Sequence, residues 1–81
     1  MARVVVTQPF AGEFFGGREQ FDLPATTLFE MVRLLDAAAP GFAESAEVRA
    51  AFAVDGAMTP DWSTALGTGS EVLVIARIAG G

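Results

Sequence analysis

Residues 72–78, close to the end of the chain, constrain the fold more than any other segment. They form a run rich in β-branched and apolar side chains, which predicts a strand. Both alternating sets of positions are apolar: Val72, Val74 and Ile78 fall on one face, and Leu73 and Ile75 on the other. Such a strand needs cover on both faces of its sheet. One helix can cover only one of them.

Two further strands are predicted near the start, over residues 4–7 and 18–23, where β-branched or alternating residues are stopped by Pro9 and Pro24. The segment between them contains Gly12, Gly16 and Gly17, and it reads as a turn region. It also carries three phenylalanines, at positions 10, 14 and 15. We expect either this Phe-rich segment or a partner protein to cover the second face of the sheet.

A helix is predicted over residues 28–39, because apolar residues recur with helical spacing at Leu28, Val32, Leu35 and Ala39. Thr27 and Glu30 have the spacing of a capping box. Pro40 and Gly41 should end the helix. Residues 44–51 fit a helical turn or the start of a strand equally well. Residues 52–54 read as a strand that enters a hairpin turn at Asp55 and Gly56.

The order of these elements predicts an α+β fold, a mixed sheet of about four or five strands with one main helix packed across it. A chain of 81 residues holds one core. We assign residues 1–78 to this domain and residues 79–81 to a flexible C-terminal tail. Leu28, Val32 and Leu35 should be buried against Val4 or Val6 and one face of the last strand.

The side-chain inventory excludes several classes of function. With 0 Cys and 0 His, the chain has no catalytic triad, no thiol nucleophile and no His or Cys metal site, so we expect no bound metal or cofactor. Asp55, Asp61 and Glu71 are scattered and read as turn and cap residues. A net charge of −5 argues against nucleic acid and favours a basic protein surface as partner. Without a signal or membrane-spanning pattern, we expect a cytoplasmic protein.

The end of the chain, Gly80-Gly81, is the feature that a small stable domain does not require. Two glycines have no Cβ, so they are thin and flexible. They can enter a narrow channel of another enzyme and present the terminal carboxylate as a reacting group. The alternative is a frayed terminus with no function.

The whole chain resembles the ubiquitin-like β-grasp sulfur carriers, and most of all the small subunit of molybdopterin synthase. The resemblance rests on Phe10-Ala11, Gly17-Arg18-Glu19, Leu23-Pro24, Thr27-Leu28, Val54-Asp55-Gly56, Leu66, Gly69-Ser70-Glu71-Val72 and Ala79-Gly80-Gly81. The chain departs from the pattern at Ser70, where the family commonly has Asp, and at Ala76 and Arg77, where many small subunits have a proline pair.

This resemblance implies a mechanism and its partners. A ubiquitin-activating-type enzyme would use ATP to adenylate the carboxylate of Gly81, and sulfur would then replace AMP to give a thiocarboxylate. The large subunit of molybdopterin synthase would accept the tail, Ala79 to Gly81, and use the sulfur to build molybdopterin of the molybdenum cofactor. The chain would not be an enzyme on its own, because the large subunit carries the catalytic groups.

Three alternatives stay open: a carrier for thiamine, cysteine or another sulfur metabolite, a ubiquitin-like modifier of protein lysines, and a plain interaction module. For the molybdopterin synthase reading, we predict that the large subunit binds the sheet face away from the helix. The candidate interface residues are Leu73, Ile75, Arg77, Ile78 and Phe52.

Overall fold

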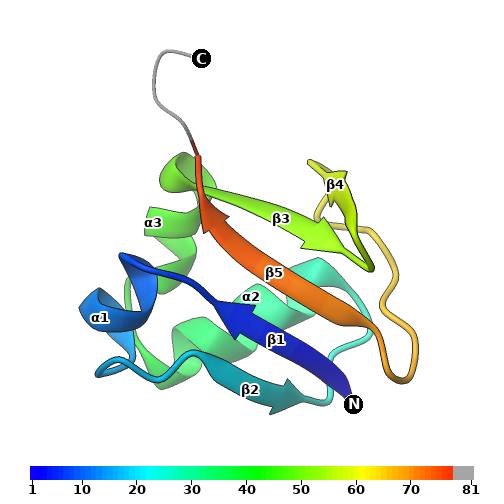
Figure 1. Ribbon diagram of the computed structural model, residues 1–81, viewed down its shortest axis with the longest axis horizontal. Helices are drawn as coiled ribbons and strands as arrows, with labels where there is room; N and C mark the ends of the chain where they lie inside the picture. Colours follow the sequence, from blue (N-terminus) through cyan, green and yellow to red (C-terminus); the bar gives the residue numbers. More distant parts are fainter. Residues whose placement is uncertain (78–81) are drawn as a thin grey trace.

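The computed structural model of the chain describes residues 1–77 (Figure 1). Residues 78–81 lie outside the described part. The elements, in chain order, are β1 (Ala2–Val6), α1 (Phe10–Phe14), β2 (Gln20–Leu23), α2 (Leu28–Ala38), α3 (Phe42–Arg49), β3 (Ala50–Val54), β4 (Ala57–Thr59) and β5 (Glu71–Ala76).

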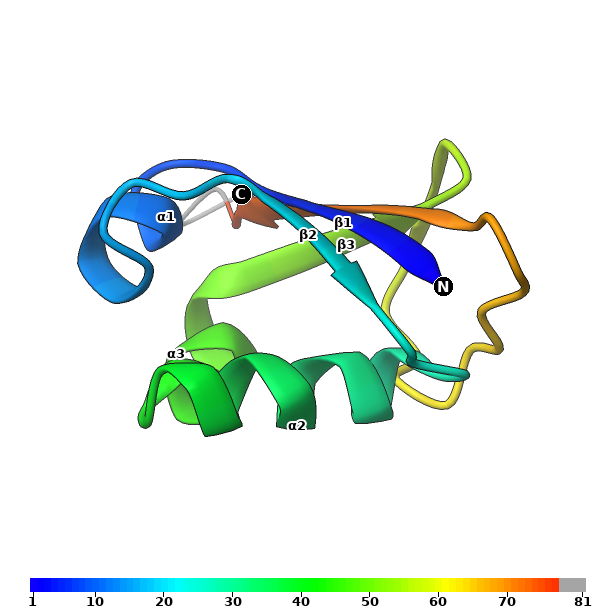
Figure 2. The ribbon, with the colours of Figure 1, turned by 90° about the horizontal axis from the view of Figure 1, so that it is seen from below.

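The strands form one five-stranded mixed sheet in the order β2-β1-β5-β3-β4. The first and last strands, β1 and β5, are parallel neighbours, and every other pair is antiparallel. A parallel pair needs a crossover connection, and the helical segment between β2 and β3 supplies it. Figure 2 shows α2 and α3 on the same side of the sheet. The predicted α+β architecture is therefore confirmed.

Helix α2 starts where the sequence predicts it. The side chain of Thr27 accepts a hydrogen bond from Glu30 N at 3.1 Å, which satisfies one of the free amides of the first turn. The carboxylate of Glu30 reaches back one residue further than in a standard capping box and accepts from Thr26 N at 2.8 Å. Leu28, Val32 and Leu35 are buried with Val4 and Val6 in the core, as predicted.

Two segments contain helices that the sequence did not predict clearly. The Phe-rich segment is not only a turn region, because Phe10–Phe14 forms the short helix α1. Gly16 and Gly17 have positive φ values and make the turn that follows it. Of the ambiguous residues 44–51, residues 44–49 belong to helix α3, and residues 50 and 51 are the first two of β3.

An aromatic cluster explains why α1 and α3 form. The Phe42 ring lies at the centre, with ring centroids 6.2 Å from Phe10, 5.6 Å from Phe14 and 5.4 Å from Phe15. Phe15 in turn packs edge-on against Phe21 of β2 at 4.9 Å. The phenylalanines of the N-terminal segment therefore pack against α3 on the helical side of the sheet. Of the two covers considered for the opposite face, the Phe-rich segment is therefore excluded.

The hairpin between β3 and β4 turns at Asp55 and Gly56, as predicted. Both residues have positive φ, 50° and 86°, which is the requirement of a two-residue type I′ turn. The Asp55 carboxylate accepts a hydrogen bond from Glu71 N at 2.9 Å. The turn is thereby tied to the first residue of β5.

Candidate functional site

The residues that the sequence analysis places at the centre of function, Gly81, Gly80, Ala79 and Ile78, lie outside the described residues. What the structure describes is Arg77, the residue from which they continue. Arg77 N donates to the carbonyl of Arg49 at 2.6 Å. Its guanidinium Nη2 donates to the carbonyl of Ala50 at 3.2 Å. The end of β5 is therefore fixed to the junction of α3 and β3, which we call the tail root.

The bond to Ala50 has a cause in the sheet. Because the Arg49 carbonyl faces β5, the next carbonyl along β3, that of Ala50, points away from β5. Strand β4 pairs with β3 only as far as the Phe52–Thr59 pair. Pro60 follows and cannot donate a backbone hydrogen bond. The guanidinium of Arg77 takes the ladder partner's place at the Ala50 carbonyl.

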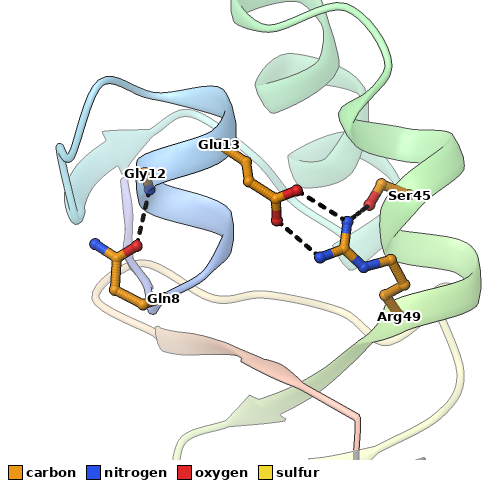
Figure 3. Close-up of polar contacts among 5 residues, drawn as sticks. All are labelled: Gln8, Gly12, Glu13, Ser45 and Arg49. Carbon is orange, nitrogen blue, oxygen red and sulfur yellow. Dashed lines mark hydrogen bonds and ion pairs between the residues drawn. The ribbon is translucent and has the colours of Figure 1, made fainter.

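A second arginine, Arg49, links the tail root to α1, and Figure 3 shows its side-chain contacts. Arg49 Nη2 lies 2.7 Å from Glu13 Oε2, and its Nη1 lies 3.0 Å from Ser45 Oγ. The guanidinium also sits 5.2 Å from the centroid of the Phe10 ring. The hydrogen bond from Arg49 holds the pKa of the Glu13 carboxyl below its usual value, and the same bond raises the pKa of Arg49. One residue therefore joins α1, α3 and the end of β5.

Helix α1 is short, and a side chain supports its first turn. Gln8 Oε1 accepts a hydrogen bond from Gly12 N at 3.0 Å, as Figure 3 shows. Such a bond satisfies one of the amides that a helix leaves free at its N-terminus. Glu13 is the residue after Gly12, and its carboxylate contacts Arg49.

The predicted apolar face is present on the side of the sheet away from α2. Val72 and Val74 point toward the helices and are buried, whereas Leu73 is 38% exposed and Ile75 is half-buried on the other side. The register sets Leu73 beside Val5 on one neighbouring strand and Ala53 on the other. We call Val5, Leu73, Ile75, Ala51, Ala53 and Met58 the open face.

Phe52 does not belong to the open face. It pairs with Val74 across the sheet, is 2% exposed and packs edge-on against Trp62 at 5.6 Å between centroids. The assignment of Phe52 to the partner interface is therefore wrong, because its side chain lies on the helical side of the sheet. Met58, which the sequence analysis did not single out, is 60% exposed at the edge strand β4.

Two of the scattered carboxylates, Asp55 and Asp61, accept hydrogen bonds within or beside turns, as the sequence predicts. Asp61 Oδ1 accepts from Ser63 N at 2.9 Å and from Ser63 Oγ at 2.7 Å, and these bonds lower the pKa of Asp61. Ser70 Oγ accepts a hydrogen bond from Gly67 N at 2.9 Å in the turn before β5. A carboxylate at this position could accept the same bond.

Within residues 1–77, no three acidic side chains converge on a point that could hold a metal ion. No helix in that part of the chain is long and apolar enough to cross a membrane.

The architecture defines a ubiquitin-like β-grasp fold, in which a mixed sheet packs around one main helix. Comparison with known proteins found no matching family model and no matching curated protein. Several solved structures share the fold. CysO of Mycobacterium tuberculosis, described as an antigen, matches with a TM-score of 0.83 at 16% identity, over 96% of this chain and 100% of that one.

Two other structures support the same assignment. A chain of the BexX/CysO complex of Amycolatopsis orientalis matches with a TM-score of 0.79 at 13% identity, and the whole of both chains is covered. SAMP1 of Haloferax volcanii matches with a TM-score of 0.70 at 19% identity, over 99% of this chain and 98% of that one. At such identities the likeness establishes the β-grasp fold.

Proposed function

We propose that this protein is a sulfur carrier that works through the carboxylate of Gly81. In the first step a carboxylate oxygen attacks the α-phosphorus of ATP in an adenylating enzyme, and pyrophosphate leaves. In the second step hydrosulfide attacks the acyl carbon and forms a C–S bond. The bond between the acyl carbon and the phosphate oxygen breaks, AMP leaves with that oxygen, and a proton is released. The product is a thiocarboxylate at Gly81.

The observation that carries the proposal is the tail root. Strand β5 runs through the centre of the sheet to Arg77, whose backbone and side chain are both bonded to the body. Gly80 and Gly81 are the third and fourth residues after Arg77. A rigid body with a terminal carboxylate on a short segment that ends in two glycines suits delivery into another protein's active site. The partner would supply the catalytic groups.

Two acceptors are compatible with this chemistry. The resemblance of the sequence motifs favours the large subunit of molybdopterin synthase and synthesis of the molybdenum cofactor. The likeness to two CysO structures favours a carrier for another sulfur pathway, such as that of cysteine, and the recorded complex with BexX fits a carrier that docks on partner enzymes. Either role uses the same thiocarboxylate, and a cytoplasmic setting supplies the ATP.

The test is intact-mass measurement of the chain after incubation with a ubiquitin-activating-type enzyme, ATP and sulfide. We expect a gain equal to one sulfur-for-oxygen exchange, and no gain when ATP is omitted. Amide adducts on lysines of other proteins would instead identify a ubiquitin-like modifier. As a positive control, each enzyme is shown to activate its own carrier. If the mass of this chain stays unchanged with those enzymes, the proposal is overturned. Incubation of the loaded chain with each candidate acceptor then distinguishes the two pathways.

A further inference from the structure

A hollow of about 440 Å³ lies beside the tail root, and its walls are Phe29, Glu47, Pro60, Asp61, Trp62 and Arg77. We call it the Trp62 hollow. We propose that it receives a basic side chain, arginine or lysine, from the partner enzyme that takes the tail. This inference rests on the proposed function and names a contact by which the partner recognises the carrier.

The aromatic part of the hollow is built onto the core. Trp62 packs edge-on against the buried ring of Phe52, and its carbonyl accepts a hydrogen bond from Phe29 N at 2.8 Å. The Phe29 and Trp62 rings meet edge-to-face, with centroids 6.0 Å apart. Phe29 is nevertheless 57% exposed, an unusual position for a large apolar ring in the first turn of a helix. The two rings are therefore held in place while part of their surface faces solvent.

The charges of the hollow favour a cation. Asp61 is kept ionised by its hydrogen bonds to Ser63, which lower its pKa. Among residues 1–77, Glu47 makes no ion pair, so its charge is available to a partner. The one cation in the wall, Arg77, has its head group on the Ala50 carbonyl. Carboxylates beside exposed aromatic rings suit a guanidinium or ammonium group, which gains both ion-pair and cation–π attraction.

Other occupants fit less well. An acidic side chain would be repelled by the two carboxylates, in a chain whose net charge is already −5. An apolar side chain would cover the Glu47 carboxylate without giving it a hydrogen-bond partner, which is unfavourable. A basic side chain satisfies the rings and the carboxylates together.

The hollow lies close to the place where a partner must take the tail. Four residues follow Arg77, and a fully extended segment of that length spans at most about 13–14 Å. A partner that holds the carboxylate of Gly81 in its active site must therefore bring the mouth of its channel within that distance of Arg77. Because Arg77 is itself a wall of the Trp62 hollow, the mouth of the channel lies within about the same distance of the hollow.

The experiment uses the full chain and an adenylating enzyme that activates it. The test variant is Glu47→Gln combined with Asp61→Asn, in which the new amide oxygen at position 61 can still accept from Ser63. The matched control is Glu19→Gln combined with Asp22→Asn, which removes the same charge beside β2, at the opposite edge of the sheet. Pyrophosphate release gives kcat and KM for the chain at low and at high salt.

We expect the test variant to raise KM about tenfold at low salt, as loss of a close charge pair does, with kcat within about twofold of the wild type. The effect should shrink at high salt. The control should stay within about twofold in both. Equal KM values for wild type and test variant, or an equal rise in the control, would overturn the inference and leave the proposed function intact. A wild-type chain that is not adenylated overturns both.

A second measurement does not depend on turnover. Trp62 is the only tryptophan of the chain, so 5-fluorotryptophan labelling gives a single fluorine resonance inside the hollow. Addition of the unlabelled enzyme should shift this resonance in the wild type and in the control variant. An unshifted resonance at an enzyme concentration that saturates adenylation would refute docking at this hollow.

Discussion

At the scale of single residues, the two arginines of the tail root divide a structural task between them. Arg49 binds Glu13 with its side chain and Arg77 with its carbonyl, so α1 and the end of β5 are linked through one residue. Arg77 was expected to meet a partner, and its head group has a partner within the chain at the Ala50 carbonyl. The sequence does not reveal this bond, because it depends on where β4 leaves β3.

The Glu13–Arg49 pair predicts a pH dependence of stability. The pKa of Glu13 is lowered in the folded chain by its hydrogen bond to Arg49. The pair therefore stabilises the fold above the unfolded-state pKa of Glu, about 4.3, and the contribution is lost as the pH falls through the lower, folded-state value. We expect the difference in Tm between wild type and Arg49→Met to be largest above pH about 5 and to shrink as the pH falls below about 4.

Thermal unfolding followed by circular dichroism across that pH range checks the prediction. Glu13→Gln should show the same narrowing toward low pH, because it removes the titrating partner of the same pair. Asp61, whose pKa is also lowered, is present in all three proteins and cancels in the differences. A difference in Tm that is constant from neutral to acid pH would show that the ion pair does not act on stability.

Truncation of Leu35 tests how much the packing of the core contributes to the free energy of unfolding. Its side chain is buried in α2 and belongs to the cluster under the sheet. Leu35→Ala should destabilise the fold by about 2–5 kcal/mol, because it leaves a cavity as well as removing buried methyl groups. Phe29→Ala, a larger truncation on the same helix, should cost only about 0.5–1.5 kcal/mol for its aromatic contact. Urea unfolding measures both, and a larger loss for Phe29→Ala would contradict this account of the core.

At the scale of elements, the sequence predicts a helix or strand well when the contacts that stabilise it join residues close together in the chain. Helix α2 was predicted almost to the residue, because its cap and its apolar stripe are local. Strand β5 was predicted because its run of β-branched and apolar residues is likewise local. The face on which Phe52 lies was not predictable, because the orientation of β3 is set by its register with β5.

Helices α1 and α3 show the same limit. Neither has a long apolar stripe, and the glycines around α1 favour a turn. What stabilises them is the cluster around Phe42, which joins residues from both helices and from β2. The Trp62 hollow escaped sequence analysis for an equivalent reason. Its rings and carboxylates come from α2, α3 and the segment after β4, and only the fold brings them together.

The open face of β5 gives a prediction at this scale. Leu73 is partly exposed between Val5 and Ala53, so Leu73→Asp should leave the fold intact. If the partner binds this face, the buried charge should weaken binding of the adenylating enzyme by about tenfold or more. Isothermal titration calorimetry measures the Kd.

The control for this prediction is Ala37→Asp, which places the same charge on an exposed position of α2, away from the open face and outside the Trp62 hollow. It should bind like the wild type. Equal Kd values for Leu73→Asp and Ala37→Asp would show that the open face is not the partner interface.

At the scale of the whole molecule, packing and chemistry fall on different parts of the chain. The core, the aromatic cluster and the tail root all lie within residues 1–77. In the proposed mechanism the only reacting atoms of the chain belong to the terminal carboxylate. Stability and function should therefore respond to different changes in the chain, which makes the carrier hypothesis testable with two variants at its end.

Deletion of Gly81 and the substitution Gly80→Val should each abolish thiocarboxylate formation while leaving Tm within about 1 °C of the wild type, since neither residue contributes to the described core. The deletion moves the carboxylate back by one residue, about 3.3–3.6 Å in an extended segment, and away from the attacking position. Valine at position 80 adds a β-branched side chain that a channel shaped for bare backbone cannot admit. Mass spectrometry after incubation with the adenylating enzyme, ATP and sulfide measures loading, and circular dichroism measures Tm. Normal loading of the Gly81 deletion would refute the carrier mechanism, and a large fall in Tm would show that the end of the chain is part of the packed structure.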